Sequence, residues 1–458
     1  LGEGNGTGCF VALPTMATSN AMYERMAEVY ASLYKPDSHP SLTLSHGSRH
    51  LSEAFRNSFE SLPHEGVIYD EKSDEGKAHR SQWLADSSKK ALLADVGVGT
   101  IDQVLLAGLP VRYQSLRAFG MSQKVLIVDE VHAFDAYMLR LLENIITAQA
   151  AFGGSVILLS ATLPFLVREK FCNAFSSGLG FCTVSLDDRN SFPVVTSVTA
   201  QNGVTEQAVE TRKSVTREVI VDFCEAIEDV YVLIEQSVDE GKCVCWIRNT
   251  ITDVTTSFEE LQGRGVENLD MFHSRFALND RLSIEKRVLA RFGKSSNPDE
   301  RRSHVLVASQ VVEQSLDLDF DVMISDLAPI DLLIQRAGRL HRHERGKRDK
   351  PVFYVHIPKD TDNPTAEWYA DTFPTAKWVY RDTALLWRTK EILKQQKRLK
   401  MPEEARLLIE SVYGDEETIK VPDVFNSSED EAWGKKMADK SYAEFNKLNF
   451  DKGYCPLA

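Results

Sequence analysis

Short apolar runs alternate with longer stretches of helical periodicity along the first half of the chain. The runs have the length of buried strands and lie at 9–14, 42–46, 91–96, 124–129 and 155–161. Between them, stretches such as 20–33 and 136–152 carry apolar residues at helical spacing. Fully apolar strands that alternate with helices are typical of a parallel sheet covered by helices on both faces.

The same alternation returns after a polar, β-rich stretch at about 183–215, which we interpret as the crossing between two domains. The later apolar runs lie at 242–249, 268–274, 303–309, 320–326 and 351–357. We therefore predict an α/β protein with a first domain over 1–200, a second over 215–365 and a helical extension over 366–458.

Composition agrees with a globular protein of two or three domains. The chain has 458 residues, of which 43% are hydrophobic and 26% charged. No apolar run in the sequence is long enough to span a bilayer, and the first residues lack the basic region of a signal peptide. We expect a cytoplasmic protein that acts as a monomer and has no membrane partner.

Net charge and cysteine spacing limit the kinds of nucleic-acid and metal binding that the chain can have. The net charge of −14 argues against a general nucleic-acid coat, so any nucleic-acid contact must be local. Basic clusters occur at 341–350 and, in a helix-like stretch, at 388–400; each fits a solvated face equally well. The seven cysteines are scattered, and Cys243 and Cys245 are expected on one side of a strand rather than at a metal.

Two acids and a histidine follow directly after the apolar run VLIV. Asp129, Glu130 and His132 stand at the predicted carboxyl end of a buried strand, where parallel sheets carry their chemistry. One acid there can hold Mg²⁺ through its waters while the other polarises an attacking water. The alternative is two surface carboxylates in a turn, and the four aliphatic residues before them favour the site.

Two further groups carry candidate chemistry. LLSAT at 158–162 ends the next run with the hydroxyls of Ser160 and Thr162, although a capped turn explains it equally well. The stretch QRAGRLHR, at 335–342, lies on and just beyond a predicted helix. It contains Gln335, Arg336, Arg339 and Arg342.

The arginines of QRAGRLHR follow one another at spacing three, which predicts that they share one helical face. Guanidinium groups suit the charge that develops on a transferred phosphoryl group. The alternative is a basic amphipathic helix. ATP held between two such domains is expected to contact the acids of one and the arginines of the other.

These motifs resemble those of a known superfamily. VDEVH, SAT and QRAGRLHR are similar to motifs II, III and VI of superfamily 2 DExD/H-box helicases. More narrowly, 10–26, 98–110, 272–281 and 308–321 resemble the CRISPR-associated helicase–nuclease of type I interference systems. The likeness spans about 10 to 450 and implies two tandem RecA-like domains followed by a helical extension.

The resemblance implies a role for each residue of the nucleotide site. Asp129 is expected to coordinate Mg²⁺ and Glu130 to activate water, with both acids near the metal. Gln335 is expected to help place that water. Arg339 and Arg342 take the positions of arginine fingers.

Further roles follow from the same resemblance. His132 is expected to contact motif VI and couple the two domains, with Ser160 and Thr162 sharing in the coupling. Asp317 matches an acid that meets the ribose of the nucleotide, and Arg336 is expected to contact the nucleotide as well.

A last set of positions matches residues that grip the phosphates of single-stranded DNA. Backbone gripping through hydroxyl and amide groups suits a motor that ignores base sequence, and it reconciles DNA binding with an acidic total. These positions are Thr15, Thr100, His273, Ser274, Arg275, Ser309 and Gln310.

Two family features are not found in the sequence. The glycine-rich GEGNGTG at 2–8 has no lysine of a phosphate-binding loop, and no His-Asp dipeptide of the nuclease domain occurs. We expect a fragment that covers the helicase core, lacks the nuclease and C-terminal domains, and is inactive by itself.

The predicted function is an ATP-dependent single-stranded DNA translocase and helicase, recruited by a crRNA-guided surveillance complex in antiviral defence. ATP and Mg²⁺ are the expected cofactors. One alternative is a non-catalytic nucleic-acid- or partner-binding module, which the absent lysine fits and the acids and arginines oppose. A general superfamily 2 RNA helicase is another.

Overall fold

A computed structural model describes residues 6–34, 40–47, 90–212, 216–314, 316–414 and 418–450. These residues form two compact units. Unit 1 holds the described residues up to Asp187, with Thr196–Glu206 and those from Lys436 onward; unit 2 holds Asp188–Val195 and Gln207–Lys435. The predicted boundaries are simpler than these, because the chain returns to unit 1 at its end.

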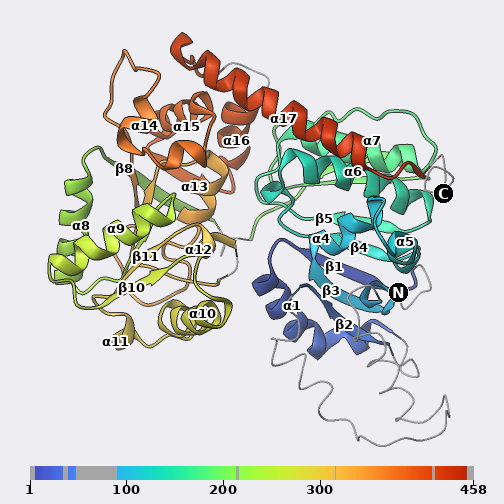
Figure 1. Ribbon diagram of the computed structural model, residues 1–458, viewed down its shortest axis with the longest axis horizontal. Helices are drawn as coiled ribbons and strands as arrows, with labels where there is room; N and C mark the ends of the chain where they lie inside the picture. Colours follow the sequence, from blue (N-terminus) through green and yellow to red (C-terminus); the bar gives the residue numbers. More distant parts are fainter. Residues whose placement is uncertain are drawn as a thin grey trace, which may run out of the picture. The chain divides into compact units, whose positions relative to one another are not determined.

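Unit 1 is built on a five-stranded parallel sheet in the order β2-β3-β1-β4-β5 (Figure 1). Its strands are β1 (Cys9–Leu13), β2 (Leu42–Ser45), β3 (Val96–Thr100), β4 (Val125–Val128) and β5 (Ser155–Leu158). Its helices are α1 (Met16–Val29), α4 (Ile101–Leu105), α5 (Gln114–Met121), α6 (Ala136–Ala151) and α7 (Phe165–Gly178). The predicted parallel sheet is confirmed.

Alternate residues of β1 bury against the two faces of this sheet. Phe10 and Ala12 join a core with residues of α4, α6 and α7. Val11 and Leu13 face the other way, toward Tyr23 of α1. This pleat explains why the strand reads as a continuous apolar run.

One predicted strand of unit 1 was misplaced. Ala91–Leu93 form a 3₁₀ helix, and strand β3 begins only at Val96. The Nζ of Lys124 binds the carbonyl oxygens of Leu92 and Ala94, which removes both carbonyls from any ladder. The real strand, VGVGT, was hidden by its glycines. A Cβ at Gly97 would lie 2.4 Å from the ring of Phe10, so the close packing itself requires glycine.

The polar crossing stretch contains a two-stranded hairpin, β6 (Val194–Thr199) and β7 (Gly203–Ala208). Val198 and Val204 of the hairpin pack on Phe165 and Cys172 of α7.

Unit 2 carries a seven-stranded sheet in the order β10-β11-β9-β12-β13-β8-β14, in which only β14 is antiparallel. Its strands are β8 (Arg217–Cys224), β9 (Val244–Ile247), β10 (Leu269–Phe272), β11 (Val305–Ala308), β12 (Val322–Asp326), β13 (Val352–His356) and β14 (Arg398–Met401). Its helices are α8 (Ile227–Asp239), α9 (Ile251–Gly263), α10 (Leu278–Phe292), α11 (Pro298–Arg301), α12 (Val311–Gln314), α13 (Ile330–Ala337), α14 (Trp368–Thr372), α15 (Thr383–Gln396) and α16 (Ala405–Tyr413).

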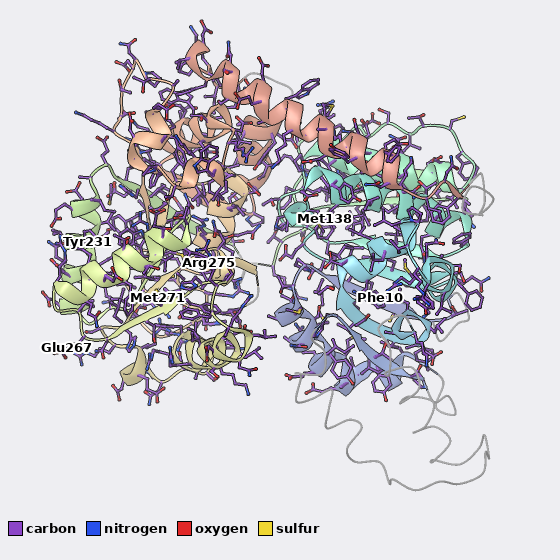
Figure 2. All side chains as sticks on the ribbon, viewed as in Figure 1. Phe10, Met138, Tyr231, Glu267, Met271 and Arg275 are labelled. Carbon is purple, nitrogen blue, oxygen red and sulfur yellow. The ribbon has the colours of Figure 1, made fainter. Side chains whose placement is uncertain are left out.

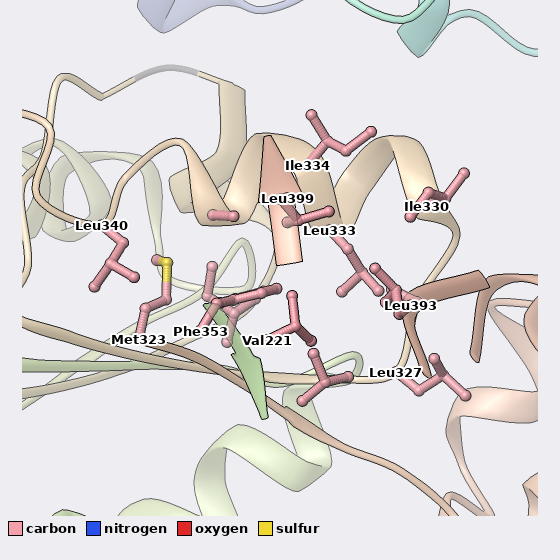
Figure 3. Close-up of a cluster of buried hydrophobic side chains, with 14 of the residues drawn as sticks. Val221, Met323, Leu327, Ile330, Leu333, Ile334, Leu340, Phe353, Leu393 and Leu399 are labelled. Atoms are coloured by element: carbon pink, nitrogen blue, oxygen red, sulfur yellow. The ribbon is translucent and has the colours of Figure 1, made fainter. Parts of the chain in front are cut away.

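Helices cover both faces of this sheet. Val244 and Trp246 of β9 pack against α8 and α9, whereas Cys243 and Cys245 face the opposite core. The predicted placement of the two cysteines on one side is therefore confirmed. Figure 3 shows part of the core that contains Cys243 and Cys245. There, residues of α13 meet Phe353 of β13, Leu393 of α15 and Leu399 of β14.

The extension after residue 365 is helical but also contributes a strand. The helix predicted around 388–400 ends earlier, since α15 stops at Gln396 and Lys397 adopts a left-handed conformation with φ of 53°. Residues Arg398–Met401 then pair with β8. The last helix, α17 (Asn426–Asn446), contributes residues to both units. No helix in the described part of the chain is long and apolar enough to cross a membrane.

Candidate functional site

The acids of VDEVH stand at the carboxyl end of β4, as predicted. The backbone nitrogen of Asp129 donates to the carbonyl oxygen of Ala12 (3.0 Å), which extends the β1–β4 ladder up to the first acid. Glu130 then leaves the strand with φ of 53° and ψ of 44°, a left-handed conformation that costs a non-glycine residue ~1–2 kcal/mol. Its side chain is 37% exposed. The turn therefore presents a carboxylate to solvent immediately beyond the sheet.

His132 links this turn to the end of the neighbouring strand. Its Nδ1 lies 3.1 Å from the hydroxyl oxygen of Ser160 and 3.4 Å from a carboxylate oxygen of Glu130. The backbone repeats the connection, because Val131 N donates to the carbonyl of Leu159 at 3.2 Å. The imidazole is 3% exposed. Motifs II and III of unit 1 thus share one hydrogen-bonded unit.

Thr162 is the more deeply placed of the two hydroxyl residues. Its backbone nitrogen donates to the hydroxyl of Ser160 at 3.4 Å, and its side chain is 2% exposed. Its own hydroxyl oxygen has no hydrogen-bond partner among the described residues.

The arginines of QRAGRLHR do not share a helical face, contrary to the prediction. Helix α13 ends at Ala337, so Arg339 and Arg342 lie in the turn that follows. Gln335, on the helix, is half-buried. A spacing of three places arginines on one face only within a helix, and α13 ends before Arg339 and Arg342.

Arg336 is completely buried inside unit 2. Its Nε donates to Glu313 at 2.6 Å, and its Nη1 donates to the hydroxyl of Ser325 at 2.7 Å and to the side-chain oxygen of Asn249 at 3.2 Å. Its Nη2 lies 3.4 Å from the hydroxyl of Tyr380. All three nitrogens of this guanidinium therefore have partners within the unit.

Arg339 and Arg342 lie in the loop that follows α13 and differ in exposure. Nη2 of Arg339 donates to the carbonyl oxygen of Glu313 at 2.5 Å, and the residue is 9% exposed. Nε of Arg342 donates to a carboxylate oxygen of Asp317 at 2.5 Å. The side chains of this second pair are 39% and 50% exposed, so Arg342 is the accessible arginine of the motif.

The basic stretch 341–350 is only partly a solvated face. Asp319, fully buried, accepts hydrogen bonds from Arg301 (3.0 Å), Arg345 (2.5 Å) and Arg348 (2.6 Å). Burial alone would raise the pKa of Asp319, but the three arginines hold it well below its usual value. This anchor fixes the loop that begins with motif VI.

The residues predicted to grip DNA also lie at carboxyl ends of strands. In unit 1, Thr15 caps α1 just after β1, and the buried Thr100 ends β3 and precedes α4. In unit 2, Ser309 and Gln310 follow β11; Nε2 of Gln310 donates to the carbonyl oxygen of Asn249 at 2.7 Å.

The HSR segment follows β10 at the same edge. Figure 2 shows Glu267 and Arg275 at opposite ends of this strand, with Met271 between them. His273 stacks on Phe276 with ring centroids 4.1 Å apart, and its Nδ1 accepts a hydrogen bond from the backbone of Arg275. Burial, assisted by the charge of Arg275, lowers the pKa of His273. Ser274 and Arg275 are exposed.

Comparisons with known proteins agree with this geometry. Residues 240–345 match the family model "CRISPR-associated nuclease/helicase Cas3, C-terminal". The Escherichia coli K12 protein "CRISPR-associated endonuclease/helicase Cas3" is 35% identical over 423 residues, which are 89% of this chain and 45% of the relative. The chain is homologous to the helicase core of Cas3 proteins.

Solved structures of Cas3 proteins share the fold. The crystal structure of T. fusca Cas3 superimposes with a TM-score of 0.82 at 30% identity, over 97% of this chain and 50% of that one. A chain of a "CRISPR RNA-guided surveillance complex, pre-nicking" matches with a TM-score of 0.72 at 27% identity, over 97% and 52%. This chain thus spans about half the length of the Cas3 proteins it matches.

Tandem RecA-like α/β units with a helical extension are therefore established for this homologue of the Cas3 helicase core. The two carboxylates at the end of β4 also suit Mg²⁺, the ion that the sequence motifs predict. No group of three or more potential metal ligands occurs among the described side chains. Mg²⁺ in nucleotide sites, however, takes only one or two protein carboxylates and is otherwise held by water and phosphate oxygens. Asp129 and Glu130 match that need.

Sequence reasoning missed the residues that organise the unit 2 part of the Cas3-like core. Asn249 donates to the carbonyl oxygen of Leu327 (2.7 Å) and lies 3.0 Å from the hydroxyl of Tyr369, while also binding Arg336. These partners are far apart in the sequence, so no spacing reveals them. The available signal was a polar RN pair directly after the apolar run CVCWI.

Proposed function

We propose that this chain is the motor part of an ATP-dependent helicase that moves along single-stranded DNA and unwinds target DNA after recruitment by a crRNA-guided surveillance complex. The names of its relatives support the helicase and CRISPR parts. Structures titled as Cas3 with ATP, ADP and AMPPNP support the nucleotide, and the surveillance complex supports the partner. The strained, solvent-facing Glu130 at the end of β4 carries the proposal.

Each group at the nucleotide has a distinct task in this proposal. Asp129 would hold Mg²⁺, which when bound would supply positive charge to the phosphates. Glu130 polarises the attacking water, while His132 ties the position of Glu130 to Ser160. Thr162 supports the same loop. We assign to His132 the coupling of unit 1 to motif VI.

Unit 2 supplies the positive charge for phosphoryl transfer. Arg342, the more exposed arginine, stabilises the charge that develops on the transferred group, with Arg339 beside it and Gln335 orienting the water. Asp317, which holds Arg342 in this structure, binds the ribose. Because Arg336 is buried and bonded within unit 2, we assign it a positioning role instead of the nucleotide contact that the sequence suggested.

DNA binding is assigned to the carboxyl edges of the two sheets. Thr15 and Thr100 in unit 1, with Ser309 and Gln310 in unit 2, offer hydroxyl and amide groups to phosphates. Arg275 adds an exposed charge. Contacts of this kind ignore base sequence.

The first test measures binding of the chain to single-stranded DNA. We expect tighter binding to single strands than to blunt duplex, little dependence on base sequence, and affinity that falls with salt. Arg275→Ala should weaken binding to all sequences alike and reduce the slope of log K against log salt by about 0.7, the value for one phosphate of a single strand.

Arg302→Ala is the matched control. Arg302 is also exposed, but it precedes β11 and lies at the amino end of the sheet. It should leave both affinity and slope unchanged. Equal affinity for blunt duplex, or a loss with Arg302→Ala as large as that with Arg275→Ala, would contradict the assignment of DNA to the carboxyl edge.

A further inference from the structure

One exposed aromatic residue of the extension stands next to the proposed DNA edge without a role in the helicase motifs. Trp378 is 69% exposed and ends the 3₁₀ helix η7 (Ala376–Trp378), in the connection between α14 and α15 (Figure 1). A tryptophan this exposed leaves most of its ring in water, where the ring is accessible to a ligand.

The turn that carries Trp378 is fixed at both ends to the carboxyl edge of the unit 2 sheet. On one side, the hydroxyl of Thr375 lies 3.1 Å from the hydroxyl of Thr250, which caps α9 immediately after β9, and it donates to Asp253. Between them, Ala376 is fully buried in the core. The backbone that carries the ring is therefore held by contacts to the sheet edge and to the core.

On the other side, Tyr380 reaches the residues assigned to DNA and to motif VI. Its hydroxyl lies 3.5 Å from Nε2 of Gln310 and 3.4 Å from Nη2 of Arg336. Gln310 is one of the proposed phosphate contacts. Trp378 is thus two residues along the chain from Tyr380, whose hydroxyl contacts a proposed DNA-binding residue.

Two positively charged side chains, which can bind the phosphates of a nucleic acid, lie near the Trp378 ring. Nζ of Lys377 lies 5.6 Å and Cζ of Arg381 lies 6.0 Å from the centre of the Trp378 ring. Asp382, the acid of the segment, is turned inward and accepts from the backbone of Leu385 as the cap of α15. Lys377 also lies 3.6 Å from Glu367, an exposed pair that contributes little and can open.

We propose that Trp378, flanked by Lys377 and Arg381, is a stacking platform for one base of the single-stranded DNA that crosses the carboxyl edge of unit 2. An aromatic face stacks on any base, and adjacent cations meet the phosphates on either side of it, so the contact adds affinity without sequence preference. This inference rests on the proposed single-stranded DNA binding and adds a contact outside the helicase motifs.

The test compares oligothymidylate with an oligomer of the same length in which the bases are replaced by abasic sites. The wild-type chain should bind the base-containing strand more tightly. Trp378→Ala should lower affinity for that strand on the order of tenfold, within the range of one aromatic–base stack, and leave affinity for the abasic strand nearly unchanged. Trp378→Phe should keep most of the difference.

Trp433→Ala is the matched control, because Trp433 is 64% exposed on α17 and has no assigned role. A single 5-iodouracil in the oligomer should also photocross-link to the peptide that contains Trp378. If wild type binds single strands and Trp378→Ala loses no affinity, the platform is wrong while the DNA assignment stands. If wild type binds no single-stranded DNA, the proposed function itself fails.

Discussion

Burial separates arginines that the sequence treats alike. Arg336 and Arg342 belong to one motif, yet the first is fully buried with Glu313 at 2.6 Å and the second pairs with Asp317 at the surface. A buried guanidinium depends on every partner, because an unpaired charge in a low dielectric is costly, whereas an exposed pair is screened by water. The same residue type therefore has different duties six positions apart.

Stability measurements should reveal this difference. Arg336→Lys keeps the charge but cannot reach Glu313, Ser325 and Asn249 together, so we expect a loss of about 3–5 kcal/mol in the free energy of unfolding of unit 2. Arg342→Ala should cost less than about 1 kcal/mol. Urea unfolding, followed by the exchange protection of amides in β12 and β13, measures both. Similar losses for the two variants would contradict the assignment of Arg336 to the interior.

At the scale of elements, the sequence predicted strands wherever side chains decide the structure. Apolar runs located β1, β4, β9, β11 and β12 to within a residue or two, because fully buried strands need such runs. It failed at β3, where glycines make room for Phe10, and at β14, where the basic RLKM looked like more helix. In both places a neighbouring element determines the conformation, and local sequence carries no trace of that neighbour.

The turn between α15 and β14 is the element-scale position most open to improvement. Lys397 has a left-handed conformation, with φ of 53° and ψ of 14°, and its carbonyl accepts from Val221 of β8. Lys397→Gly should stabilise unit 2 by about 1 kcal/mol, because glycine has no Cβ penalty there and is preferred after a helix. Lys394→Gly, within α15, should cost about 1 kcal/mol. Amide exchange of β14 and β8 reports both, and a loss of protection in Lys397→Gly would show that the turn is not strained.

At the scale of the whole molecule, each unit carries some of the candidate functional residues, and the sequence could supply these residues but not their partners. Asp129, Glu130 and the arginines were visible as motifs. The link from His132 to Ser160, the anchor at Asp319 and the network around Asn249 were not, because each joins residues separated by at least two elements. Motifs name the groups that contact ligands, and tertiary contacts determine which of them are free to do so.

If the two units serve one nucleotide, variants in each should fail at the same step. In a polypeptide that also carries a phosphate-binding lysine, Glu130→Gln should leave ATP binding nearly intact and abolish turnover, because an amide keeps the shape of the acid but cannot polarise water. Arg342→Ala should lower turnover on the order of 10³-fold, since its charge is needed mainly as the phosphoryl group departs. Both variants should still bind single-stranded DNA with normal affinity, unlike Arg275→Ala.

The test measures turnover, nucleotide affinity and DNA affinity of each variant in parallel. Near-normal turnover in either variant, or DNA binding lost in step with turnover, would mean that the carboxylate at the end of β4 and the exposed arginine of motif VI do not act on the same phosphate.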